Sequence, residues 1–119
     1  GDIIGAGKAL HWGFSNHRPW QVGELVRLCD QLGVPRPVVC HPHYNLVMRM
    51  MENDLIPACE YYGIGLAPFS PLARGVLTGK YDPDKKPPKE SRAARGDNSI
   101  LKRDFRKESF RVVERIKKR

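Results

Sequence analysis

A short apolar run that ends in polar side chains occurs three times along this chain. The runs lie at residues 9–16, 38–45 and 64–69, and segments with helical spacing at 19–32 and 54–62 separate them. The order of strand, polar exit, helix and next strand is typical of a parallel α/β fold. Ligands of such folds bind at the carboxyl ends of the strands, so the polar residues there are candidate ligand contacts.

The two helical segments carry recognisable start and stop signals. Pro19 suits a first helical turn, and we expect Asn16 nearby to cap this helix. Asn53 is the corresponding candidate cap for the segment 54–62. The first helix also has an apolar stripe at spacings of three, four and seven residues, formed by Val22, Leu25, Val26 and Cys29.

The stretch that follows the third run is rich in glycine and carries cations. Gly75 and Gly79 stand beside Arg74 and Lys80. Small residues allow a close backbone approach and cations neutralise an anion, so this loop is a candidate phosphate site. A buried strand that continues into an ordinary surface loop fits the same pattern.

Three segments in order resemble the aldo-keto reductase family. The pattern Ala6-Gly-Lys8 … Gly13-Phe-Ser-Asn16 resembles its fifth barrel strand, and the segment ending in His43-Tyr-Asn45 resembles its sixth. The segment Phe69-Ser-Pro-Leu-Ala-Arg-Gly-Val-Leu-Thr-Gly-Lys-Tyr81 resembles the seventh strand with its cofactor loop. The branch most resembled holds the potassium-channel beta subunits and similar bacterial enzymes, and the likeness covers roughly residues 5–95.

The resemblance implies an α/β fold, the (β/α)₈ TIM barrel, and an NADP(H)-dependent oxidoreductase that reduces aldehydes or ketones to alcohols. The family's reaction uses an Asp, a Tyr, a Lys and a His from earlier strands. No tyrosine of this chain lies in the matching motif, so we assign no catalytic residue. A non-catalytic regulatory subunit that binds the cofactor, and an inactive truncated fragment, are the alternative interpretations.

The length bounds the domain organisation. A (β/α)₈ barrel usually needs about 250 residues, whereas this chain has 119. We therefore expect a fragment of one barrel domain, with three βα units at 1–81, a mobile cofactor-strap loop at 82–108 and the start of the next helix at 109–119. Three strands taken from a barrel leave two unpaired edges, so we do not expect the chain to be stable as a monomer.

Four residues at the strand ends are implied contacts of a nicotinamide ring. Ser15 and Asn16 would bond its carboxamide, although Asn16 as a helix cap is the simpler interpretation without the family. His41 stands where the family commonly has a glutamine. An imidazole can donate or accept one hydrogen bond at that distance, but it cannot offer both there as an amide does. Phe69 occupies the position of the aromatic residue that stacks under the ring, with barrel core as its alternative role.

The loop after Phe69 supplies the remaining implied cofactor contacts. The turn Ser70, Pro71 and Leu72 follows the stacking position directly. Arg74 belongs to the candidate phosphate loop, and Lys80 and Arg92 match basic residues that hold cofactor phosphates in the channel-subunit branch. Residues 82–95 would then close over the dinucleotide as a lid.

The positive charge of the chain is concentrated in its last third. Residues 1–79 balance six Lys/Arg against six acids, whereas residues 80–119 hold fifteen Lys/Arg against seven acids and carry the whole net charge of +8. A basic tail raises the question of nucleic-acid binding. The sequence shows neither aromatic residues interleaved for base stacking nor helix-turn-helix or zinc-finger spacing, so we expect no nucleic-acid partner. A solvated loop and helix face is the ordinary interpretation.

The cysteines and histidines suggest neither a disulfide framework nor a metal site. Cys29, Cys40 and Cys59 are odd in number and lack paired spacing, which favours small buried hydrophobic residues in a reducing cytoplasm. His41 and His43 alternate and could share a face, but a zinc site needs further ligands, so we expect no metal.

No apolar run approaches the length of a membrane helix. We expect a cytoplasmic protein that acts on a small carbonyl substrate.

Overall fold

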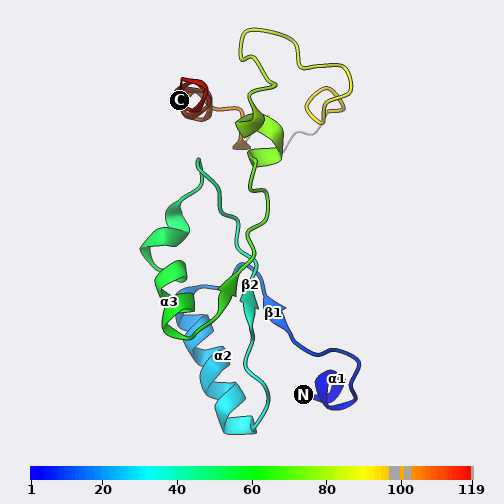
Figure 1. Cartoon of the computed structure of the whole chain (residues 1–119), viewed down its shortest axis with the longest axis vertical. Coiled ribbons are helices and arrows are strands. Elements are labelled where there is room, and N and C mark those ends of the chain that lie inside the picture. The colour runs from blue at the N-terminus through cyan, green and yellow to red at the C-terminus, as the bar shows by residue number, and fades with distance from the viewer. Residues whose placement is uncertain (97–99, 101–102, 119) are drawn as a thin grey trace. The chain divides into compact units, whose positions relative to one another are not determined.

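The computed structural model describes residues 1–96, 100 and 103–118. The chain forms two compact units (Figure 1). The first unit comprises Gly1–His43 and Met50–Phe69, and the second comprises Tyr44–Arg49 and Ser70–Arg119. The three predicted strands fall in the first unit, and the basic loop with the final helix falls in the second.

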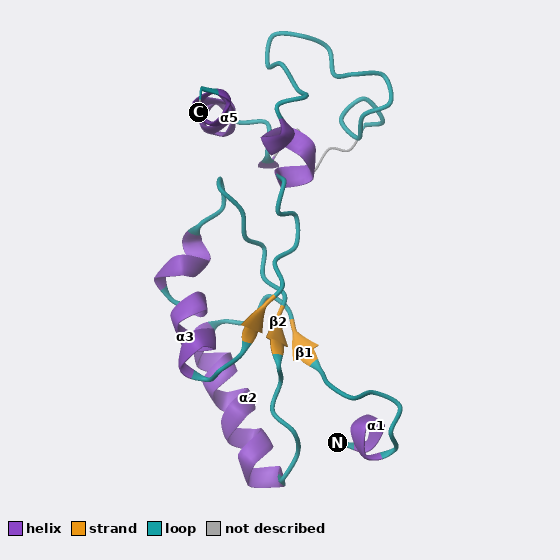
Figure 2. Ribbon diagram, in the orientation of Figure 1, coloured by secondary structure: helices purple, strands orange, loops and turns teal. Residues whose placement is uncertain are grey.

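The first unit contains a three-stranded parallel sheet with the order β1-β2-β3 (Figure 2). The strands are β1 (Gly13–Phe14), β2 (Val39–Cys40) and β3 (Gly65–Leu66). The expected strands are therefore confirmed in place, although each pairs over two residues. Gly13 permits the close approach of β1 to β2, because a Cβ atom at this position would lie 2.3 Å from the carbonyl oxygen of Val39.

Helices connect these strands, as in a parallel α/β fold. The short helix α1 (Asp2–Gly5) precedes β1, α2 (Pro19–Leu32) connects β1 to β2, and η1 (Met50–Asn53) with α3 (Leu55–Tyr61) leads to β3. Both predicted caps are wrong. Arg18 is the N-cap of α2 and its amide donates to Gln21 Oε1 at 2.8 Å, while Asp54 caps α3 through the Leu55 amide.

The core of the first unit lies between the sheet and the two longer helices. Figure 2 shows α2 and α3 beside one another on one side of the strands. All three cysteines are buried and unbonded, as expected for small hydrophobic side chains. The core side chains come from each strand or its flank and from both helices: Phe14, Val22, Val26, Cys40, Leu55, Cys59 and Ile64.

The second unit packs the helix α5 (Lys107–Lys117) against the short helical segment η2 (Ala73–Thr78). Helix α5 begins two residues before the predicted start at 109. Residues 82–96 contain turns but neither helix nor strand. Residues 97–99 and 101–102 of the predicted loop, and residue 119 of the predicted helix, lie outside the described residues. The core of this unit consists of Ala73, Val76, Tyr81, Ala93, Ile100 and Val113.

Candidate functional site

The carboxyl ends of β1 and β2 bring Ser15 and His41 together. The hydroxyl of Ser15 donates to the backbone carbonyl of His41 at 2.6 Å, and the amide of His41 donates to the carbonyl of Phe14 at 2.7 Å. Both Ser15 and His41 are exposed. Since the single hydroxyl hydrogen is used within the protein, Ser15 Oγ presents lone pairs that can accept a hydrogen bond from a ligand N–H.

Asn16 follows Ser15 in a left-handed backbone conformation, with φ of 56°. Asparagine tolerates this region better than most residues, and the conformation turns the chain out of β1 toward α2. The alternative role of Asn16 as the cap of α2 is excluded, because that helix begins after Arg18. The exposed amide of Asn16 therefore stands at the strand end with both a donor and an acceptor.

His41 reaches the next strand through its ring. Its Nδ1 contacts the backbone carbonyl of Ala67. A carbonyl oxygen can only accept, so Nδ1 carries the hydrogen, and Nε2 of the neutral ring is an acceptor. The His41 ring also lies against Phe69, with 5.5 Å between ring centroids.

Phe69 lies at the end of the third predicted run and is half-buried. Its amide donates to the carbonyl of Pro42 at 2.9 Å, and a parallel bridge pairs Phe69 with His43. The buried His43 ring is stacked on Phe69 at 5.0 Å with 14° between the planes. His43 therefore holds the Phe69 ring in a fixed orientation. A ring fixed in this way can stack against a second flat group, such as the ring of a ligand.

These side chains suit the two ends of a primary carboxamide. The NH₂ group of a carboxamide needs acceptors, which Ser15 Oγ and His41 Nε2 supply, and its oxygen needs a donor, which the Asn16 amide supplies. Position 41 therefore still offers a hydrogen-bond acceptor, His41 Nε2, although the family commonly has a glutamine there. The amide chemistry of nicotinamide fits the residues present.

The second unit holds the other predicted contacts on a tightly turned segment. Ser70, Ala73 and Arg74 have φ values of 55°, 46° and 52°, and Gly75 has φ of 98°. The side-chain amide of Asn45 donates to the carbonyl of Ser70 at 2.9 Å. Pro71 and Leu72 are exposed within this turn. Several consecutive left-handed residues cost conformational free energy, so other contacts must hold them in place.

Arg74 makes one of those contacts. Its guanidinium Nη1 lies 2.7 Å from Asp104 Oδ2, and the two side chains are only 14% and 5% exposed. The pair ties η2 to the segment just before α5. In this structure the charge of Arg74 is thus balanced inside the unit, and its contact is with Asp104.

Lys80 and Arg92 are the exposed cations of the predicted phosphate set. Lys80 Nζ lies 5.2 Å from the centroid of the Tyr81 ring. A Cβ atom on Gly75 would lie 2.8 Å from Lys80 Cε, so the glycine leaves room for the lysine to fold back over the loop. Beside Arg92, the buried Ser91 accepts a hydrogen bond from the amide of Ala94 at 3.2 Å.

Sequence reasoning missed three supporting residues. These are His43, as the ring behind Phe69, Asn45, as the side chain that holds the Ser70 turn, and Asp104, as the partner of Arg74. Asn45 closes the second apolar run, so its position at a strand end was a usable signal. Asp104 lies 30 residues beyond Arg74 among many charges, and no spacing rule points to it.

Two classes of site are missing from the described part of the chain. No three His, Cys, Asp or Glu side chains gather there as a metal ion would require. Among the helices of residues 1–96 and 103–118, none combines the length and the apolar character that a membrane crossing needs.

Known proteins resemble the chain along almost its whole length. The model of the Aldo/keto reductase family matches residues 2–118. A probable voltage-gated potassium channel subunit beta of Oryza sativa subsp. japonica is 34% identical over 97% of this chain and 35% of its own length. Aflatoxin B1 aldehyde reductase member 2 of Rattus norvegicus is 40% identical over 69% of this chain and 23% of its own length.

An aldo-keto reductase of Babesia bovis is 39% identical over 66% of this chain and 29% of its own length. The chain thus spans about a quarter to a third of the curated relatives that it matches. The family resemblance seen in the three ordered segments is confirmed, and the chain belongs to the aldo/keto reductase family.

Proposed function

We propose that this chain carries part of the cofactor site of an NADP(H)-dependent oxidoreductase that reduces small aldehydes or ketones to alcohols. Its three strands would be strands five to seven of a (β/α)₈ barrel in a cytoplasmic protein. The observation that carries the proposal is the contact chain Ser15–His41–Phe69 across the ends of three parallel strands. Membership of the family supports an oxidoreductase of this general kind.

Each site residue has a separate task in this proposal. Ser15 and His41 accept from the carboxamide NH₂, Asn16 donates to its oxygen, and Phe69 lies flat against the ring. These contacts present one face of the ring to a substrate. The cofactor supplies the hydride, and the protein's part here is orientation.

The cations of the second unit would hold the phosphates. Lys80 and Arg92 are exposed and carry the charge that a dinucleotide needs, and residues 70–72 with Gly75 shape the loop. Arg74 acts in this proposal through the loop, because its guanidinium is paired with Asp104.

Nuclear magnetic resonance titration tests these assignments, since it detects even millimolar binding. Nicotinamide mononucleotide should shift the amide signals of Ser15, Asn16 and His41, and adenosine 2′,5′-bisphosphate should shift those of Lys80 and Arg92. NADPH should shift both sets. Saturating NADPH that leaves the amides of the Ser15 set in place would contradict the proposal.

Variants add a quantitative check on the stacked ring. Phe69→Ala should weaken NADPH binding by roughly 1–3 kcal/mol, the scale of a lost aromatic contact. Tyr61→Ala is the matched control, because this ring is 83% exposed and belongs to the last residue of α3 instead of the carboxyl end of a strand. Equal affinities of the two variants would remove Phe69 from the site.

Lys80→Met and Arg92→Leu test the phosphate contacts. Each should weaken NADPH binding and flatten its dependence on salt, because exposed charge pairs are screened. Lys86→Met and Arg95→Leu are controls with exposed side chains on the same segment. If both test variants bind like the parent at low salt, the loop does not hold phosphate.

A regulatory role is the second candidate function. The rice relative that covers 97% of this chain is described as a probable channel subunit beta. A regulatory protein of this kind would bind the cofactor through the same residues without turnover. Binding of NADPH without oxidation of NADPH by any aldehyde, in a complete protein that contains this segment, would favour it over the enzyme.

A further inference from the structure

A pocket of about 660 Å³ opens beside α5 in the second unit. Most of its lining surface is apolar, and its volume is in the range of sites that hold a drug-sized group. None of the residues assigned to the cofactor lines it. Its apolar side chains come from Pro83, Phe105 and Phe110, and its charged ones from Arg106, Lys107, Arg111, Glu114 and Arg115.

The aromatic part of this pocket is preformed. Phe105 meets the buried Tyr81 edge-to-face at 5.1 Å, and Phe110 meets Phe105 edge-to-face at 5.1 Å. Both phenylalanines pack against the core of the unit, to which Tyr81 belongs, and this core holds them in place. An apolar side chain from a partner would find a surface that needs little reorganisation, which favours binding.

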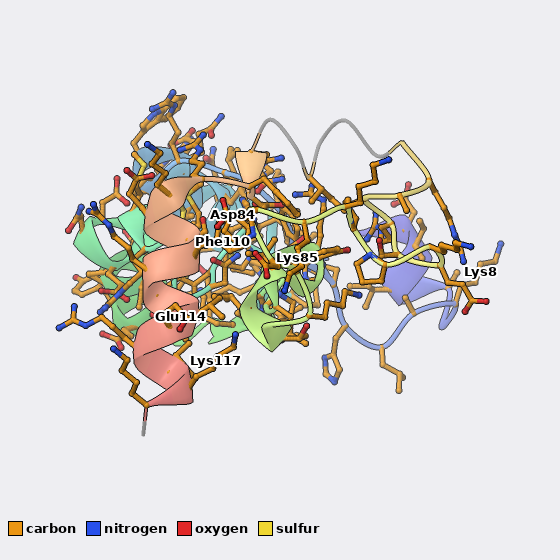
Figure 3. The ribbon with its side chains drawn as sticks, turned by 90° about the horizontal axis from the view of Figure 1, so that it is seen from above. Lys8, Asp84, Lys85, Phe110, Glu114 and Lys117 are labelled. Atoms are coloured by element: carbon orange, nitrogen blue, oxygen red, sulfur yellow. The ribbon has the colours of Figure 1, made fainter. Side chains whose placement is uncertain are left out.

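The charges of the pocket are strongly one-sided. Four cations line it, and its one acid, Glu114, already accepts from Lys117 Nζ at 3.0 Å. Figure 3 shows Phe110, Glu114 and Lys117 following one another along α5. Within residues 1–96 and 103–118, no carboxylate forms an ion pair with the four cations. Arg111 and Arg115 are four residues apart and so lie about 6 Å from each other along one face of α5.

We propose that this pocket, lined by Phe105, Phe110, Arg111 and Arg115, binds an acidic peptide segment of a partner protein. One large apolar side chain of the peptide lies against the two phenylalanines. Carboxylates beside it pair with Arg111 and Arg115, whose planar guanidinium groups suit bidentate contacts. Side chains two residues apart in an extended peptide point to the same face and lie about 6.6 Å from each other. An apolar residue followed by acids two and four residues later therefore presents all three side chains to the pocket and matches the spacing of the two arginines.

The geometry favours a peptide over a nucleic acid. A base needs the exposed flat face of an aromatic ring for stacking. Phe105 and Phe110 are half-buried and already packed edge-to-face, so a branched aliphatic or aromatic side chain fits better than a stacked base. Helix-in-groove and pocket recognition of peptides uses one apolar anchor with charges around it.

Fluorescence polarisation of the full chain with a labelled nine-residue peptide tests the proposal. The peptide carries a central leucine among glutamates, and a second peptide replaces this leucine by glycine. The double variant Arg111→Gln/Arg115→Gln removes two charges from the pocket. The double variant Lys86→Gln/Lys89→Gln removes the same charge from exposed positions outside it.

The arginine variant should bind the leucine peptide about tenfold more weakly than the parent chain, and the lysine control less than about twofold more weakly. The glycine peptide should also bind about tenfold more weakly, which reports on the apolar contact without altering the protein. Equal losses in the two double variants, or equal affinities of the two peptides, would overturn the proposal. So would a single-stranded oligonucleotide that binds more tightly than the peptide and loses affinity with the same two arginines.

Discussion

Burial governs the chemistry of the two thiols in the core of the first unit. Cys40 and Cys59 are both 0% exposed. Burial, with Cys59 beside it, raises the pKa of Cys40 from 9.0 to about 12, and burial also raises the pKa of Cys59. Both thiols therefore keep their protons in the folded chain at a pH where the unfolded chain releases them. The free energy of unfolding must then fall as the pH rises above about 9, since the unfolded state binds fewer protons there.

We expect the loss from Cys40 to approach about 1.4 kcal/mol per pH unit between pH 9 and its raised pKa of about 12, and Cys59 to add to the loss in the same direction. Urea unfolding followed by circular dichroism at pH 7, 9 and 10 measures it. The double variant Cys40→Ala/Cys59→Ala should be less stable at pH 7, because it leaves small cavities, but its stability should decline less steeply with pH. An unchanged slope in the double variant would assign the alkaline loss to other groups.

At the scale of helices and strands, the spacing of apolar residues predicted where the elements lie. The exact helix ends depend on which of several neighbouring residues acts as the cap. The apolar runs placed β1, β2 and β3 correctly, because burial follows from composition, but the ladder covers only two residues in each strand. Asn53 and Asp54 are both good caps, and the sequence could not say which side chain would reach the Leu55 amide. The strand-end residues Ser15, His41 and Phe69 were predictable, because parallel strands bring their carboxyl ends to one edge.

The ion-pair partner of Arg74 could not be predicted in the same way. The place of Arg74 beside Gly75 predicted a cation that neutralises a phosphate, whereas the structure pairs it with Asp104 in the second unit. A pair 30 residues apart depends on how η2 and the segment before α5 pack, and local patterns carry no such information. This pair gives a test of what holds these two elements together.

Asp104→Asn should lower the free energy of unfolding of the second unit by about 3 kcal/mol, because it leaves a buried guanidinium without its counter-charge. Arg74→Met/Asp104→Leu should recover part of the loss, since no buried charge remains. Asp30→Asn is the control: it breaks the Arg36–Asp30 pair, whose side chains are 52% and 49% exposed, and should lower the free energy of unfolding much less, because water screens an exposed pair. Amide hydrogen exchange resolves the two units, and equal losses for Asp104→Asn and Asp30→Asn would show that the buried pair does not hold η2.

At the scale of the whole molecule, the first unit leaves apolar surface uncovered. Leu10, Trp20 and Val38 are 83%, 70% and 44% exposed. Among the residues that the structure describes, no strand pairs with the outer edge of β1 or of β3. Unpaired edges beside apolar side chains promote association. We therefore expect the purified 119 residues to form oligomers at micromolar concentration, which light scattering would detect.

The same 119 residues should not reduce carbonyl compounds. Hydride transfer needs a bound cofactor and also a proton donor beside the carbonyl oxygen. Under the proposed function the chain would supply Ser15, Asn16, His41 and Phe69 for the first requirement and, by motif, no residue for the second. Oxidation of NADPH in the presence of a nitrobenzaldehyde should therefore proceed at the rate of the control without protein. A chimera that carries this segment in the complete rice relative should bind NADPH, and Phe69→Ala should weaken that binding. Turnover by the 119 residues clearly above the control, and lost with Phe69→Ala, would show that the chain holds its own proton donor.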